Sequence, residues 1–153
     1  MTRLIKRAVC AALGLMALTS LAQAAAVNED NGVAIKGYDP VAYFTDHKPV
    51  KGAQSHKFEY QGAVYEFASE AHRRLFAAAP EKYLPQFDGF CAYGVAAGRK
   101  ADIDPAAFSI VDGKLYLNRS LKVRDTWSQD IPGYLQKAQT AWPTVAQQTE
   151  VVR

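Results

Sequence analysis

The sequence predicts an α+β fold: a small single domain in which antiparallel β-hairpins pack with short helices. Two strong turn signals, Gln61-Gly62 and Asp112-Gly113, each separate a pair of runs with strand-like alternation. Segments with helical spacing lie between and after these hairpins, over about 69–80 and 130–143. Because strands and helices do not alternate one by one, a parallel βαβ sheet is not expected.

The first 24 residues are predicted to be a cleavable signal peptide. Three basic residues precede the uncharged run 8–18, and small residues follow it. The A-x-A pattern at 22–24 supplies a cleavage site, and 24–26 supplies a second choice. The run is shorter than the ~20 residues that span a bilayer, and an uncleaved anchor is the alternative reading. We therefore expect a periplasmic or secreted protein with no stable membrane insertion after cleavage.

Removal of the signal changes both the charge and the cysteine count. Three of the 18 Lys and Arg residues lie in the signal and none of the 15 Asp and Glu residues does, so the mature chain is near neutral. A nucleic-acid partner loses its electrostatic support and is not expected. Cys10 leaves with the signal, and Cys91 is then a lone thiol that is buried, bound to a ligand or paired with another chain.

The first predicted hairpin joins strands 55–60 and 63–67, and Gly62 supplies the positive φ of its turn. Directly opposed residues share a face of a hairpin. The expected pairs are Tyr60 with Ala63, Phe58 with Tyr65 and His56 with Phe67 on an apolar face, and Lys57 with Glu66 on a solvated face. A histidine is thus expected at the edge of the apolar face.

A short helix follows, with Ser69 as its N-cap and Pro80 as its stop. Its inward stripe is predicted to be His72, Leu75, Phe76 and Ala79. The second hairpin pairs 108–111 with 114–118. A helix over 120–128 carries Trp127, and a last helix begins near Asp130 and is expected to stop at Pro143, leaving 147–153 as a polar tail.

The motifs of the mature chain resemble those of exported YHS-domain proteins. They are Gly37-Tyr38-Asp39-Pro40-Val41-Ala42-Tyr43-Phe44, Tyr60-Gln61-Gly62, Tyr65-Glu66-Phe67-Ala68-Ser69, Gly89-Phe90-Cys91-Ala92, Asp112-Gly113-Lys114, Trp127 and Ala141-Trp142-Pro143. The resemblance implies a YHS-like domain over 25–146 with a treble-clef-like core and a C-terminal extension.

The better-understood YHS domains bind metal through cysteines, and the resemblance implies where those cysteines would stand. Ala42 and Ala68 occupy two of these positions, and His72 occupies the position of the helix cysteine. Because alanine cannot ligate a metal and one cysteine remains, a four-thiolate zinc site is excluded.

The remaining candidate ligands for copper or zinc are Cys91, His72 and His56, with His47 a weaker candidate in a polar loop. The alternative is that each histidine is packed and hydrogen-bonded, and that Cys91, flanked by apolar residues, is a buried inert thiol. Asp39 and Pro40 are expected to form a rigid turn that feeds Tyr43 into the core.

The sequence thus predicts an exported, non-catalytic YHS-type binding module, with copper or zinc as its expected ligand. The alternative is an interaction protein that docks a periplasmic partner without metal. An enzyme is not expected, because no paired carboxylates, phosphate-binding glycine loop or activated nucleophile is visible. Asn118-Arg119-Ser120 also matches a glycosylation pattern, and Ser120 is explained as a helix cap.

Overall fold

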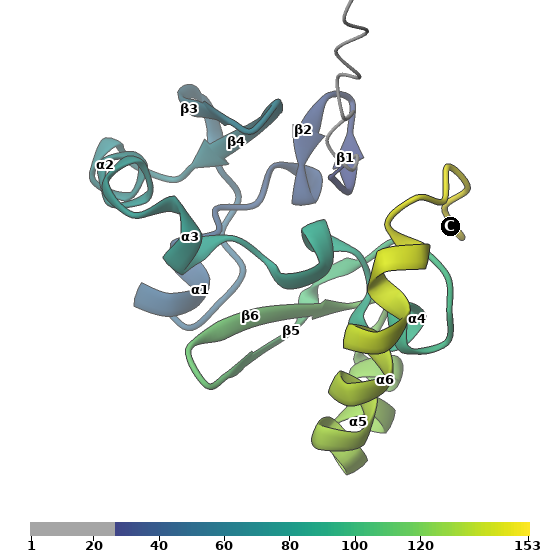
Figure 1. Ribbon diagram of the computed structural model, residues 1–153. Coiled ribbons are helices and arrows are strands. Elements are labelled where there is room, and N and C mark those ends of the chain that lie inside the picture. The colour runs from purple at the N-terminus through teal and green to yellow at the C-terminus, as the bar shows by residue number, and fades with distance from the viewer. Residues whose placement is uncertain (1–26) are drawn as a thin grey trace, which may run out of the picture.

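The computed structural model describes residues 27–153, so the predicted signal peptide and both cleavage sites lie outside the described residues. This part of the chain forms a four-stranded sheet of order β1-β2-β4-β3 and a separate hairpin, β5-β6, with short helices around them (Figure 1). The α+β prediction is confirmed. No helix within residues 27–153 combines the length and the apolar character needed to cross a bilayer.

The strands are β1 (Glu29–Asp30), β2 (Val33–Ala34), β3 (Ala53–Tyr60), β4 (Ala63–Phe67), β5 (Asp104–Val111) and β6 (Lys114–Asn118). The helices are α1 (Ala42–Thr45), α2 (Glu70–Ala78), α3 (Pro80–Tyr83), α4 (Ala92–Ala96), α5 (Leu121–Trp127) and α6 (Ile131–Val145), with 3-10 turns η1 (Ile35–Gly37), η2 (Gln86–Gly89) and η3 (Ser128–Asp130). In Figure 1 the four-stranded sheet and α2 lie at one end, α5 and α6 lie at the other, and β5-β6 runs between them.

The hairpin of β3 and β4 follows the predicted register only near its turn. Phe58 pairs with Tyr65 as predicted, but the register shifts beyond Lys57, and Ala53 rather than His56 faces Phe67. The pairing expected for His56 is therefore wrong, because an irregularity of the bulge type inserts extra residues into β3. The predicted solvated face is also partly covered, since Glu66 is 8% exposed.

Helix α2 begins where the sequence predicts, because the Ser69 side chain accepts a hydrogen bond from the backbone N–H of His72. Phe76 is fully buried and contacts the aromatic rings of the β3-β4 hairpin. The rest of the predicted inward stripe is only partly correct: Leu75 is 43% exposed and Ala79 is also exposed. A nine-residue helix on a narrow sheet buries one side chain deeply rather than a full stripe.

The β5-β6 hairpin has the predicted register, with Phe108 opposite Leu117 and Ile110 opposite Leu115. Both faces of β6 are covered, because Leu115 and Leu117 pack in one cluster and Tyr116 packs against Trp127 in another. This burial on both sides makes the hairpin the centre of the described fold.

The C-terminal segment departs from the prediction in two respects. Helix α6 runs through Pro143 to Val145, because a proline near a helix end removes only one backbone hydrogen bond and the last turn continues. The segment predicted as a polar tail docks instead: the Val152 backbone exchanges hydrogen bonds with Asp102 and Lys100, and the Gln148 side chain bonds Gly98 and Lys100.

Candidate functional site

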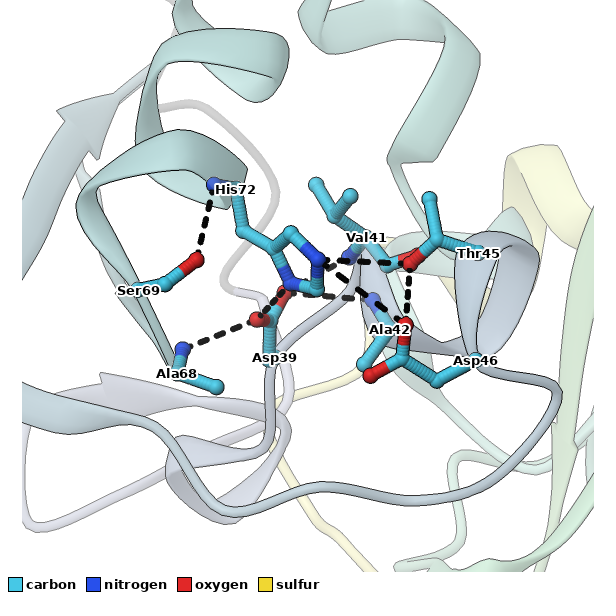
Figure 2. A network of polar contacts seen from close by, with 8 residues as sticks. All are labelled: Asp39, Val41, Ala42, Thr45, Asp46, Ala68, Ser69 and His72. Atoms are coloured by element: carbon cyan, nitrogen blue, oxygen red, sulfur yellow. Dashed lines mark hydrogen bonds and ion pairs between the residues drawn. The ribbon is translucent and has the colours of Figure 1, made fainter.

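A buried carboxylate, that of Asp39, organises the polar centre of the first half of the chain (Figure 2). Its Oδ1 accepts hydrogen bonds from the backbone N–H groups of Val41 and Ala42, at 2.8 and 3.3 Å. Its Oδ2 accepts from the N–H of Ala68 at 2.8 Å and lies 2.6 Å from Nδ1 of His72. One side chain therefore ties α1, the end of β4 and α2 together.

The His72 ring is held in a single orientation by this contact. With Oδ2 of Asp39 as the acceptor, Nδ1 carries a proton, and in the neutral form of the ring Nε2 keeps a lone pair. Nε2 faces α1, where it lies 3.4 Å from Oγ1 of Thr45 and 3.9 Å from Oδ1 of Asp46 (Figure 2). Its side chain is 16% exposed, and Asp46 is more exposed at 36%. Nε2 thus lies near the surface beside the Thr45 hydroxyl and the Asp46 carboxylate, whose Oδ1 accepts a hydrogen bond from Thr45 Oγ1 at 2.8 Å.

The three positions that the family resemblance marks as cysteine positions meet at this carboxylate. The N–H groups of Ala42 and Ala68 both donate to Asp39, and His72 contacts it through Nδ1. Where the resemblance implies thiolates around a metal, this chain has a carboxylate surrounded by donors. The interior of the site is satisfied by protein groups, and the ligand atom of the imidazole nearest the surface is Nε2, whose contact with the Thr45 hydroxyl is long, at 3.4 Å.

Cys91 lies elsewhere, in the apolar cluster formed with Ile35, Tyr43, Leu115 and Leu117. The residue is 1% exposed, and it is the N-cap of α4, where its Sγ accepts from the N–H of Gly94 at 3.4 Å. Burial raises the pKa of the thiol, and the backbone donors around it offset that effect only in part. Among the sequence-based alternatives for Cys91, the buried thiol is the one that this geometry fits.

His56 and His47 also lie away from the network. Nδ1 of His56 lies 3.8 Å from Oε2 of Glu70, a carboxylate already bonded by Arg73 and Arg74. His47 is exposed on the loop after α1 and has a φ of 53°. Neither histidine shares a polar contact with His72 in the described residues.

The candidate ligands are thus not brought together as a set. Across residues 27–153, no group of three or more His, Cys, Asp and Glu side chains is arranged to hold a metal ion. The expected grouping of Cys91, His72 and His56 does not form. His56 lies on β3 and His72 on α2, whereas Cys91 is buried at the start of α4 in a separate apolar cluster.

The remaining motif residues have structural roles. Tyr43 is fully buried and its hydroxyl donates to the Pro105 carbonyl at 3.1 Å, which agrees with the predicted aromatic plug. Pro40 is buried beside it, and Trp127 is fully buried against Tyr116. Tyr38 is half-buried under the Lys51 ammonium, 5.0 Å from its ring centre.

Sequence reasoning missed three residues of the site. The local sequence pattern around Asp39 predicts only a turn, and no pattern gives Thr45 or Asp46 a role. Asp39 and His72 are 33 residues apart, so no local spacing joins them. The signal that could have done so is the resemblance itself, since Ala42 and His72 both mark ligand positions and Asp39 is three residues before Ala42.

The structure also shows whether the asparagine of the glycosylation pattern, Asn118, is accessible. Asn118 is fully buried, and its Oδ1 accepts hydrogen bonds from the N–H of Tyr93 at 3.2 Å and from the Cys91 thiol at 3.6 Å. Modification of this side chain would require the hairpin to unfold. Ser120 caps α5 as predicted, with its Oγ accepting from the N–H of Val123.

Comparison with known proteins gives a family match for one part of the chain. No curated protein and no solved structure matches the sequence. The family model that does match covers α1, the β3-β4 hairpin, α2 and α3, and so includes His72 and both alanines around Asp39. Residues 41–87 match the YHS domain.

Proposed function

We propose that this chain is an exported, non-catalytic binding module of the YHS type that takes one copper or zinc ion at His72. The observation that carries the proposal is the 2.6 Å contact between Nδ1 of His72 and Oδ2 of Asp39. Histidines that ligate metals commonly donate their other N–H to a carboxylate, which fixes the tautomer and makes the free nitrogen a better donor. Nε2 of His72 has that environment.

Asp46 is the natural second donor. Its Oδ1 lies 3.9 Å from Nε2, and an ion about 2.0–2.2 Å from each atom fits between them at a wide angle. The Thr45 hydroxyl, 3.4 Å from Nε2, is a neighbouring oxygen. Two protein donors leave the remaining coordination positions to water or to a ligand from a partner. Imidazole with one carboxylate suits zinc or copper.

The ligand set in this proposal differs from that expected from the sequence. Cys91 is excluded from it because the thiol is buried among apolar residues, and His56 because its ring faces Glu70. The absence of catalysis is part of the proposal. It rests on the packing role of the thiol and on Asp39, whose oxygens are occupied by donors and are not free to act on a substrate.

A second candidate function is an interaction module that needs no metal. The observation in its favour is that the Asp39 network satisfies the centre of the site with protein donors alone. In this case His72 links α1 to α2, and the surface formed by α1 and the loop after it contacts a periplasmic partner.

One experiment separates the two candidates. The mature chain is titrated with Cu²⁺ and with Zn²⁺ by isothermal calorimetry, and metal content is measured after purification without an affinity tag. We expect one equivalent to bind, His72→Ala to abolish binding and Asp46→Asn to weaken it at least tenfold. His47→Ala is the matched control, because it removes an exposed imidazole of the same part of the chain.

Two results would contradict the metal proposal. One is absence of binding by the wild-type chain. The other is binding that is unchanged in His72→Ala but lost in His47→Ala or His56→Ala. Absence of binding leaves the interaction module as the better explanation of the contact between Asp39 and His72, and the second result assigns the metal to another histidine.

A further inference from the structure

A small hollow lies between the β3-β4 hairpin and the segment that follows α3. Its volume is about 120 Å³. It is lined by Val27, Tyr60, Gln61, Tyr65, Leu84, Pro85 and Asp88. None of these residues belongs to the Asp39 network, so the hollow is independent of the proposed metal site. Pockets for drug-sized ligands hold about 300–1,000 Å³, so this one suits a group of side-chain size.

A tyrosine side chain borders the hollow. Tyr65 is 2% exposed and is one of the residues that line the hollow. The neighbouring Tyr60 hydroxyl donates its proton to Oε1 of Glu81 at 2.6 Å. A phenol oxygen can accept a hydrogen bond as well as donate one, so Tyr65 offers an acceptor to a ligand in the hollow.

The Asp88 carboxylate also lines the hollow. It forms no hydrogen bond and no ion pair within the described residues, and burial raises its pKa. Lys100 is the cation that acts on it, but its Nζ lies over the Phe90 ring, 4.9 Å from the centre. Burial also raises the pKa of Tyr65, and the charges of Asp88 and Glu81 raise it further. Asp88 is therefore the acidic side chain among the residues that line the hollow.

The backbone holds Asp88 in place. Its φ is 51° and that of Phe87 is 54°, a left-handed conformation that few residues other than glycine adopt. The N–H of Asn28 bonds the Asp88 carbonyl at 2.8 Å, which anchors this turn to the start of the described chain. The backbone at Asp88 is thus fixed to the start of the described chain by a hydrogen bond.

We propose that this hollow binds a primary alkylammonium group. The ammonium donates to the Asp88 carboxylate and the Tyr65 hydroxyl, and its alkyl stem lies against Leu84, Pro85 and Val27. An ammonium has three N–H donors and no acceptor, which matches a site that offers acceptors and negative charge. The same chemistry is found in a free small amine and in the side chain of a lysine on a partner protein.

The test uses the mature chain, labelled with ¹⁵N and titrated at neutral pH with n-butylammonium. We expect saturable shifts of the amides of Tyr65, Leu84 and Asp88, and no shifts in the β5-β6 hairpin. n-Butanol, which keeps the stem but lacks the charge, should produce no saturable shift. Nα-acetyl-lysine methylamide distinguishes the sources: tighter binding than butylammonium assigns the site to a lysine side chain, and weaker binding assigns it to a free amine.

Asp88→Asn should lower the affinity for butylammonium at least tenfold. Asparagine tolerates a positive φ, so the turn is retained. Asp112→Asn is the matched control, because Asp112 also has a positive φ, of 50°, in an exposed turn of the other hairpin. Because the pKa of Asp88 is raised by folding, its ionised form opposes folding, and Asp88→Asn should also raise the unfolding midpoint at neutral pH.

Three results would overturn this proposal: no saturable binding of butylammonium, equal binding of butanol, or unchanged affinity in Asp88→Asn. His72→Ala provides the link to the metal site. It should leave butylammonium binding unchanged, whereas Asp88→Asn should leave copper and zinc binding unchanged, so failure of one proposal is distinguishable from failure of the other.

Discussion

The sequence offers both His72 and Cys91 as candidate metal ligands, and the fold places them in opposite environments. His72 lies at the junction of α1 and α2, bonded to a buried carboxylate and open to solvent on one side. Cys91 lies under the β5-β6 hairpin, 1% exposed and surrounded by aliphatic and aromatic side chains. A ligand atom needs both an orienting partner and an open side, and only the histidine has both.

The comparison teaches that residue type alone does not make a ligand. A thiolate is the stronger donor for copper or zinc, yet the Cys91 thiol is held in its neutral form because burial raises its pKa. An imidazole is the weaker donor, yet the tautomer of His72 is set by Asp39. Three substitutions test this contrast, from the largest expected effect to the smallest.

Asp39→Asn should have the largest effect on stability. Asparagine cannot accept hydrogen bonds at both ends, so at least one N–H among those of Val41, Ala42 and Ala68 loses its acceptor. Breaking a buried charged network costs about 3–5 kcal/mol. Urea denaturation followed by circular dichroism measures the loss.

Asp46→Asn is the control for that substitution, since it makes the same chemical change in an exposed side chain and should alter stability by less than ~0.5 kcal/mol. If Asp39→Asn were as mild as its control, Asp39 would not organise the junction, and the orientation of His72 would need another explanation.

Cys91→Ser should have an intermediate effect, a loss of roughly 1–3 kcal/mol, because a hydroxyl is more costly to bury than a thiol. Metal binding should not change. In the native chain the thiol should react with iodoacetamide far more slowly than in urea. Rapid alkylation at neutral pH, or loss of metal binding in Cys91→Ser, would contradict the inert role.

The raised pKa of the Cys91 thiol should make the stability of the protein depend on pH. Because its pKa is raised in the folded state, the folded chain retains this proton when the unfolded chain loses it, and stability declines as pH rises above the ordinary thiol value of ~8.5. Cys91→Ala lacks this contribution. The stability advantage of the wild type over Cys91→Ala should therefore shrink between pH 8 and pH 10 in parallel urea titrations, by about 1.4 kcal/mol for each unit of pKa shift that is traversed.

His56→Ala should have the smallest effect, below ~0.5 kcal/mol, with no change in metal affinity. Its side chain is one third exposed and lies 3.8 Å from Glu70, a carboxylate already bonded to Arg73. A loss of metal binding in this variant would place the ligand set on the β3 side of α2 rather than on the α1 side.

Local sequence patterns were sufficient to predict turns, helix caps and strand register where a few consecutive residues determine the geometry. Gln61-Gly62 and Asp112-Gly113 form the predicted turns, Ser69 and Ser120 cap the predicted helices, and both hairpins have the predicted register next to their turns. Each of these features depends on contacts between residues only a few positions apart, which is why sequence alone determines them.

Only the tertiary structure decided the chemistry of the candidate site. The bulge in β3 moved His56 away from Phe67, and the contact between Asp39 and His72 joins segments 33 residues apart. The burial of Cys91 depends on β6, and the hollow beside Asp88 depends on the approach of the β3-β4 hairpin to the segment after α3. Such contacts depend on how several elements pack at once, and no local pattern of residues encodes that packing.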